Sequence, residues 1–201
     1  MTLLTDAVRR LEETVLGTGC EEGAADLRRD PGVPRCQFER GADLLASFGG
    51  KTAGVVTPAP VQTSTRLSSL FGRGLGSPEE RTAALGIVNA VSGFLCLSRR
   101  LHACDPGCHG ACLEELREEL GGRRIHTPVQ IPTVSREFPA SLTDDPAGAG
   151  IILVGSEAVI QEEGGDLAAM AAGGRILLLG PSTTGVASLL CLPHWCPYGR
   201  L

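Results

Sequence analysis

The chain has 201 residues, 42% of them hydrophobic and 20% charged, which excludes a disordered protein and allows one large domain or two small ones. Its net charge is −5 and aromatic residues make up only 3%, so neither a nucleic acid nor an anionic membrane surface is expected as a partner. No apolar run approaches the ~20 residues of a membrane span, and the N-terminus has no signal-peptide core. We therefore expect a cytoplasmic protein whose eight cysteines are thiols or metal ligands.

The first part of the chain predicts a helix followed by strands. Residues 5–16 carry apolar residues at helical spacing, and glycines end the predicted helix. A polar segment broken by prolines follows and holds Cys20 and Cys36, which we interpret as structural because no metal-like neighbours accompany them. Residues 42–48 fit a short strand or a helix, and residues 51–57 alternate toward a strand.

A second helix is predicted from residue 77 to about residue 95. Ser77 is a capping residue, proline follows it at the first helical position, and Glu80 stands three residues after the cap. The helix is apolar nearly all round and is therefore expected to be buried. Asn89, its one polar interior residue, is either a hydrogen-bonded core amide or a residue that faces a cleft.

The second half of the chain alternates strands and helices. We expect strands near residues 123–129, 151–154 and 175–179, helices over 113–120 and 166–172, and a loop over 131–150. The all-apolar run at 151–154 is typical of a parallel strand that is buried on both faces. Alternating strands and helices predict a Rossmann-like parallel sheet.

Three cysteines and two histidines fall within residues 101–112. We expect a strand over 94–103 and then a helix that Asp105 caps, which places Cys104 just ahead of the helix start. Cys108 and Cys112 then lie one turn apart on one face. The helix dipole favours thiolates at this end, and soft metals bind thiolates. The alternative is that the cysteines simply pack into the core as small apolar residues.

A second group of cysteines lies in the tail, at residues 191–199. The tail either packs against the rest of the protein without binding a ligand, or it supplies further soft ligands to the same metal site. Cys191 is the weakest candidate among its side chains. The predicted metal ligands are Cys104, Cys108, His109, Cys112, His194 and Cys196.

A glycine turn follows the last predicted strand and consists of Gly180, Pro181, Ser182 and Thr183. Ligands of α/β sheets usually bind at such turns, where parallel strands end. The turn either holds a phosphate, a carboxylate or a metal-bound anion, or it caps the next helix without a ligand. The turn at residues 106–110 is expected at the same edge of the sheet, so that both turns line one cleft.

Two stretches resemble the heavy-metal chelation family. Residues 77–90 resemble its E-R-x-x-G-x-A-x-x-N-A helix, and residues 177–183 resemble its strand and G-P-S-T turn. The resemblance implies an α/β protein in which a smaller α+β domain like the enolase N-terminal domain, residues 1–95, precedes a Rossmann-like metal-chelation domain, residues 96–201. It also implies a cleft between them that is lined by Asn89 and by Gly180, Pro181, Ser182 and Thr183.

The chain departs from that family at two points. The family's first Rossmann turn is usually apolar and rich in glycine, whereas residues 104–112 read C-x3-C-x3-C. The family also tends to continue further past the G-P-S-T turn than residues 185–201 do.

Three functions fit the sequence. The first is binding of a soft transition metal or an iron–sulfur cluster through the cysteine cluster. The second is a Rossmann-type enzyme or binder of a small molecule or nucleotide at the Gly180–Thr183 turn, although no G-x-G-x-x-G motif follows the first strand. The third is a structural subunit with buried cysteines. The expected partner is a metal ion or a small anionic ligand, a homo-oligomer is allowed, and the sequence does not decide whether the protein is an enzyme.

Overall fold

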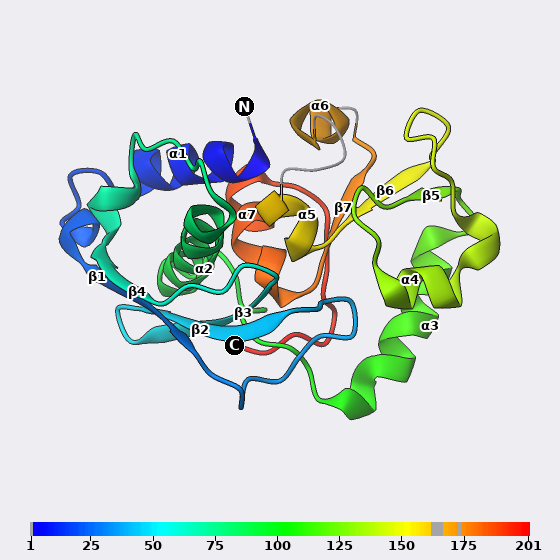
Figure 1. Cartoon of the computed structure of the whole chain (residues 1–201), viewed down its shortest axis with the longest axis horizontal. Coiled ribbons are helices and arrows are strands. Elements are labelled where there is room, and N and C mark those ends of the chain that lie inside the picture. The colour runs from blue at the N-terminus through cyan, green and yellow to red at the C-terminus, as the bar shows by residue number, and fades with distance from the viewer. Residues whose placement is uncertain (1, 162–166, 173) are drawn as a thin grey trace.

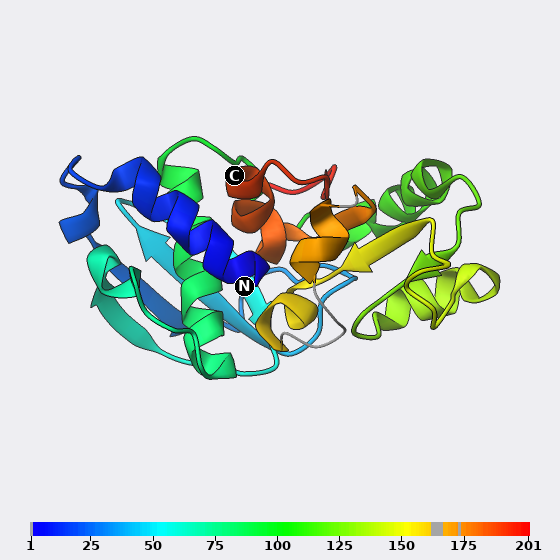
Figure 2. The same ribbon diagram turned by 90° about the horizontal axis from the view of Figure 1, so that it is seen from above.

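The computed structural model of the chain describes residues 2–161, 167–172 and 174–201 and shows a mixed α/β protein with two separate sheets (Figure 1). One sheet is antiparallel and has the strand order β3-β2-β1-β4. The other is parallel and has the order β5-β6-β7-β8. Helices lie between the two sheets and on the far side of the parallel sheet (Figures 1 and 2).

The first half of the chain forms the antiparallel sheet and two long helices. Its elements are α1 (Leu3–Val15), β1 (Ala24–Arg29), β2 (Ala42–Phe48), β3 (Lys51–Thr57), β4 (Thr63–Arg66) and α2 (Pro78–Phe94). The helix expected over 5–16 and the strand expected over 51–57 are confirmed, and residues 42–48 form a strand. In the view of Figure 2, α1 crosses over α2.

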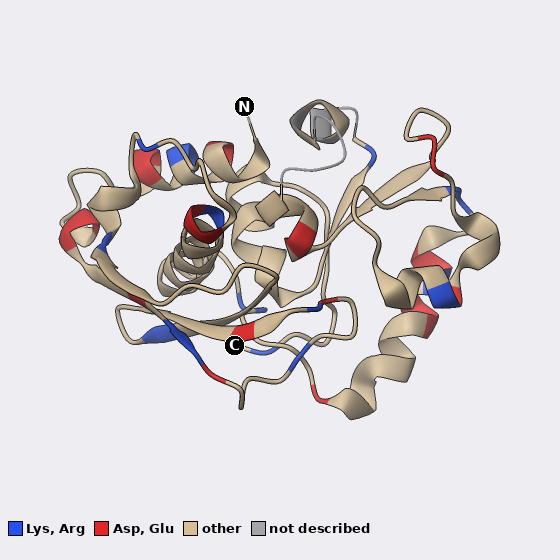
Figure 3. Ribbon diagram, in the orientation of Figure 1, with Lys and Arg blue, Asp and Glu red and all other residues tan. Residues whose placement is uncertain are grey.

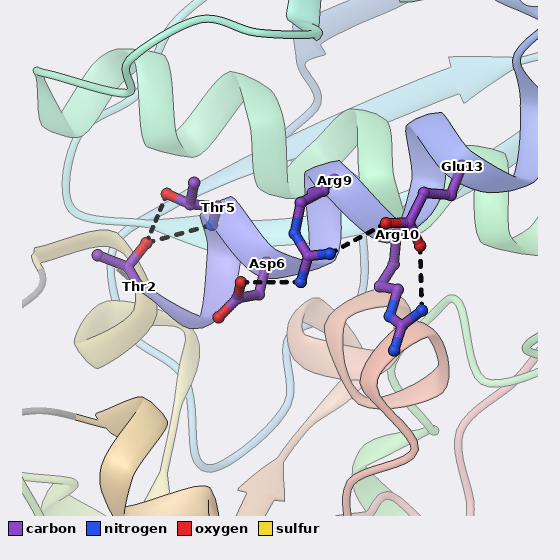
Figure 4. Close-up of polar contacts among 6 residues, drawn as sticks. All are labelled: Thr2, Thr5, Asp6, Arg9, Arg10 and Glu13. Carbon is purple, nitrogen blue, oxygen red and sulfur yellow. Dashed lines mark hydrogen bonds and ion pairs between the residues drawn. The ribbon is translucent and has the colours of Figure 1, made fainter.

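Local hydrogen bonds fix where α1 begins. The hydroxyl of Thr2 accepts a hydrogen bond from the Thr5 amide at 3.2 Å, so Thr2 is the N-terminal cap (Figure 4). Further along the exposed face, the Arg9 guanidinium contacts Asp6 at 3.4 Å and Glu13 at 3.0 Å. The opposite, apolar face of the helix is buried in the core, as its spacing predicts.

The predicted capping box at the start of α2 is confirmed. The Ser77 hydroxyl accepts a hydrogen bond from the Glu80 amide at 3.2 Å, and the Glu80 carboxylate accepts one from the Ser77 amide at 3.1 Å. The helix then packs on the antiparallel sheet so closely that a Cβ at Gly86 would lie 2.7 Å from the Leu27 side chain. Any larger residue at position 86 would have to displace the Leu27 side chain, so glycine allows α2 to pack closely on β1.

The second half forms the parallel sheet and its helices. Its elements are α3 (His109–Leu120), β5 (Ile125–His126), α4 (Pro132–Glu137), β6 (Ile151–Val154), α5 (Ser156–Gln161), α6 (Leu167–Ala172), β7 (Ile176–Leu179), α7 (Thr184–Leu190) and β8 (His194–Trp195). Alternate strand residues face opposite cores: Ile152 and Leu178 pack with α2, α5 and α7, whereas Leu153 and Leu179 pack with α3 and α4. This two-sided burial explains why the strands are apolar throughout.

One hydrophobic core joins the two halves. It contains Leu44 and Val55 of the antiparallel sheet, Val88 of α2, and Val154 and Val186 of the second half. Helix α7, in the middle of the molecule, contains no charged residue (Figure 3). The division into domains at residue 95 stays a prediction, because the core is continuous across that position. None of the described helices is long and apolar enough to cross a membrane.

The structure differs from the sequence-based expectations at four places. Residues 94–103 do not form a strand, because only His102 finds a bridging partner, Arg200. Strand β1 lies in the segment expected to be irregular, where only two of its six residues are buried. Helix α4 lies in the expected loop, and β8 forms within the tail.

The capping box gives a direct test of this fold. We expect Ser77→Ala to lower the free energy of unfolding by about 1 kcal/mol, because the Glu80 amide loses its hydrogen-bond partner. Urea denaturation followed by circular dichroism measures the change. Ser64→Ala, at an exposed position of β4, is the control and should change stability by less than about 0.5 kcal/mol. Equal effects of the two substitutions would contradict the assignment.

Candidate functional site

Residues 36–40, here called the strap, belong to the first half of the chain and form hydrogen bonds and an ion pair with the second half. The Gln37 side chain donates a hydrogen bond to the His109 carbonyl at 2.9 Å. The Thr133 hydroxyl donates to the Gln37 carbonyl at 2.6 Å, and the Arg40 guanidinium pairs with Glu157 at 2.7 Å. The strap is thereby fixed to α3, α4 and α5, so its side chains are held against the second half.

Four cysteines meet beside the strap and line one cavity, here called the thiol cavity. They are Cys36 of the strap, Cys104, Cys112 of α3 and Cys196, and His109 also lines the cavity. All four are buried, and none forms a disulfide. They come from three parts of the chain that are distant in the sequence, around residues 36, 104–112 and 196, so the tertiary fold brings these parts together.

The tail is held in place by backbone hydrogen bonds. The Arg200 amide donates to the His102 carbonyl at 2.8 Å, and the His102 amide donates to the Arg200 carbonyl at 2.9 Å. The Arg200 guanidinium also pairs with Asp105 at 3.3 Å. The Tyr198 hydroxyl donates to the Glu115 carboxylate on α3. These contacts position Cys196 opposite the segment that carries Cys104.

Burial controls the protonation of the thiols. It raises the pKa of Cys196 to about 12 and the pKa of Cys36 well above its usual value. It raises the pKa of Cys104 and Cys112 as well. The thiols that line the cavity are therefore neutral at pH 7. Cys104 lies outside the helix, since α3 begins only at His109.

The proposed cap of that helix is also absent. The Asp105 side chain makes no capping hydrogen bond. Pro106 instead opens a short 3-10 turn, Pro106–Cys108, that leads into α3. The helix expected over 113–120 is present as part of α3.

The structure places some of the predicted metal ligands together and others apart. Cys104, His109, Cys112 and Cys196 line the thiol cavity, whereas Cys108 is half-buried and does not. The His194 ring nitrogen Nε2 lies 2.9 Å from the Gly180 carbonyl oxygen and is thus engaged at the glycine turn. The exposed Cys191 ends α7 in a left-handed conformation.

Sequence reasoning missed Cys36 as a member of the cavity. Cys36 and Phe38 are both buried, although the surrounding segment is polar. Two apolar residues at alternate positions in a polar segment are a sign that it enters the core. This pattern predicts that Cys36 is buried, but it does not predict which core residues Cys36 contacts.

The thiol cavity is small, and the space in it open to a water-sized sphere is about 10 Å³. This is close to the least that a single water molecule needs. Within the described part of the chain, no three His, Cys, Asp or Glu side chains converge closely enough to hold a metal ion as they stand. The Nε2 atom of His109 is buried and has no hydrogen-bond partner among the described residues.

The Gly180–Thr183 turn lies next to the strap and is fully buried. The Ser182 hydroxyl accepts a hydrogen bond from the Val56 amide at 2.9 Å. The Asn89 side chain donates to the Ser182 carbonyl and accepts from the Gly185 amide, both at 2.7 Å. Asn89 therefore does face the turn, and it is a fully hydrogen-bonded core amide. These polar groups bond to one another, and their role in ligand binding stays a prediction.

Glu39 of the strap is the charged group nearest to this turn. Its Oε1 accepts a hydrogen bond from the Ser182 amide at 3.1 Å, and its Oε2 is buried without a partner among the described residues. Burial raises the pKa of Glu39 to about 7. A Cβ at Gly180, whose φ is +81°, would lie 2.7 Å from Glu39 Oε1, so the approach requires glycine. Sequence reasoning did not single out Glu39.

Comparisons with protein-family models, with curated proteins and with solved structures found no match. The function of the chain is therefore inferred from the side chains that meet at the strap.

The raised pKa of Glu39 predicts how stability depends on pH. The folded protein binds a proton at this carboxyl up to about pH 7, whereas the unfolded chain releases it near its usual value of 4.5. Stability should therefore fall as the pH rises from 4.5 through 7, by on the order of 3 kcal/mol. Glu39→Gln should remove this part of the slope, as measured by urea denaturation across that range.

The exposed Glu118 of α3 provides the matched control. Glu118→Gln should leave the pH profile of the wild type unchanged. A Glu39→Gln profile that runs parallel to the wild type would show that the pKa of Glu39 is not raised in the folded protein.

Proposed function

We propose that the protein binds one soft transition-metal ion in the thiol cavity, through the sulfur atoms of Cys36, Cys104, Cys112 and Cys196. The observation that carries the proposal is that four unpaired thiols, from three parts of the chain that are distant in the sequence, line the same cavity. Thiolates and imidazole nitrogens are the ligands that such ions prefer. His109 supplies the imidazole, and its buried Nε2 has no partner among the described residues.

The partnerless imidazole argues against the cysteines being mere packing residues. Free cysteines pack well as small apolar groups, so buried thiols alone need no ligand. A buried ring nitrogen without a hydrogen bond is different, because it costs about 1–3 kcal/mol. A metal ion bound to His109 would remove that cost.

Binding requires movement within the cavity. Since the thiols do not surround a common point, they must turn inward when the ion replaces their protons. The space of about 10 Å³ suits a single ion and is too small for an iron–sulfur cluster, which contains several atoms. We therefore favour a single ion over a cluster. Cys108 and His194 lie outside the cavity lining and are not part of the proposed ligand set.

We also propose that the two halves correspond to the architecture that the family resemblance implies. The antiparallel sheet with α2 would be the enolase N-terminal-like part, and the parallel sheet with its helices would be the Rossmann-like part. The order of elements along the chain supports this. The thiol cavity would then lie between them, because Cys36 comes from the first part and the other ligands come from the second.

Binding of a small molecule or nucleotide at the Gly180–Thr183 turn is the weaker proposal. The turn is buried, and Ser182 uses its amide, hydroxyl and carbonyl within the protein. A ligand there would have to replace these hydrogen bonds, each of which joins the turn to another element.

Titration with Cd²⁺ under reducing conditions tests the metal proposal. Wild-type protein should take up about one ion per chain and show the ultraviolet absorption of thiolate–cadmium bonds. Replacement of Cys112 and Cys196 by serine removes two sulfur ligands and should weaken binding at least about tenfold. Circular dichroism checks that the variant folds.

Cys191→Ser is the matched control, because Cys191 belongs to the same tail but is exposed and is not part of the cavity lining. This variant should bind Cd²⁺ as the wild type does. If the double variant also binds as the wild type does, the cavity is not the metal site.

The raised pKa values of the thiols give a further prediction. Each sulfur must lose a proton to bind the ion, so the affinity for Cd²⁺ should increase as the pH rises from 6 to 8. Calorimetric titration in buffers with different ionisation enthalpies measures the protons released. Affinity that does not change with pH would contradict coordination by these thiols.

A further inference from the structure

A second cavity is lined only by residues 61–87 of the first half and shares no residue with the thiol cavity. It is enclosed by the end of β4, by residues 69–75 and by the first turns of α2. The space open to a water-sized sphere is about 210 Å³. This is room for roughly seven water molecules, or for an organic molecule of similar size.

The floor of this cavity is apolar. Leu70 and Ile87 are buried, and Leu75 and Ala83 pack against the same core. Water in such a place has few hydrogen-bond partners, so an apolar group that displaces it is stabilised. The floor therefore fits the hydrocarbon part of a ligand.

The mouth of the cavity carries charges of both signs. Arg73 and Glu79 line it, both are exposed, and neither forms an ion pair or side-chain hydrogen bond with a described residue. Glu80, which also lines the cavity, is already used by the capping box of α2. One guanidinium and one carboxylate are thus available at the mouth.

We propose that this cavity binds a small zwitterion, namely a free α-amino acid with an apolar side chain. Its carboxylate would meet the Arg73 guanidinium, its ammonium group would meet the Glu79 carboxylate, and its side chain would cover Leu70 and Ile87. A ligand with only one charge would leave one of the two groups at the mouth without a partner. The proposal is independent of metal binding, so either can fail alone.

Isothermal titration calorimetry with leucine and three derivatives tests the proposal. Leucine should bind the full-length protein. Leucinamide lacks the carboxylate and N-acetylleucine lacks the ammonium group, so each should bind at least about tenfold more weakly. N-acetylleucinamide lacks both charges and represents a peptide segment that docks beside the free edge of β4.

Substitutions at the mouth and on the floor locate the site. Arg73→Gln and Glu79→Gln should each weaken leucine binding about tenfold, and Ala83→Leu should abolish it by filling the cavity. The control is Arg99→Gln, since Arg99 is exposed and lies outside the cavity lining. Circular dichroism confirms that each variant is folded.

Three results would overturn the proposal. The first is that neither leucine, isoleucine, valine nor methionine binds at millimolar concentration. The second is that N-acetylleucinamide binds as tightly as leucine, which would identify a peptide site. The third is that Arg73→Gln and Arg99→Gln have the same effect.

Discussion

The structure depends on the way its second half covers the outer edge of β3. In the strand order β3-β2-β1-β4, β3 is a terminal strand, and an uncovered edge leaves backbone groups unpaired. Here the Ser182 hydroxyl accepts from the Val56 amide, the Ser156 hydroxyl donates to the Val56 carbonyl, and the Leu101 carbonyl accepts from the Gly54 amide. These three contacts fix the parallel sheet against the antiparallel one. The strap, the glycine turn and the tail all take their positions from that arrangement.

The two groups of buried polar residues near the strap differ in how well they are satisfied. Around Ser182 the Val56 amide and the Asn89 side chain are hydrogen-bonded, which joins the two halves, and Glu39 Oε2 is buried there without a partner among the described residues. In the thiol cavity the sulfur atoms are neutral and the His109 ring is incompletely bonded. We interpret the hydrogen-bonded turn around Ser182 as a rigid support, and the thiol cavity beside it as a site whose side chains can rearrange around a ligand. This contrast favours chemistry at the cysteines over chemistry at the glycine turn.

Local signals in the sequence were sufficient for much of the fold. The capping box at Ser77 and the apolar runs of β6 and β7 predicted their elements because neighbouring residues alone determine them. Strand β1 and the lining of the thiol cavity were missed because they depend on distant partners. Cys36 and Cys196 line the same cavity only because the tertiary structure brings their segments together. Glu39 is likewise buried because it packs against Ser182, a residue that is distant in the sequence. Four of the predicted ligands, Cys104, His109, Cys112 and Cys196, nevertheless line one cavity, and their binding of a metal stays a prediction.

The closeness of Cys36 to Cys196 also concerns the unfolded chain. These residues lie near opposite ends of the sequence, so a bond that joined them, directly or through a bound ion, would close a loop containing most of the polypeptide. The entropy removed from an unfolded chain grows with the logarithm of the loop length, and a loop this long lies near the upper end of the effect. Any bridge between Cys36 and Cys196 would therefore increase the free energy of unfolding of the whole protein. One of its two anchor points would lie in the strap, which belongs to the first half, and the other in the tail, which is bonded to the second half.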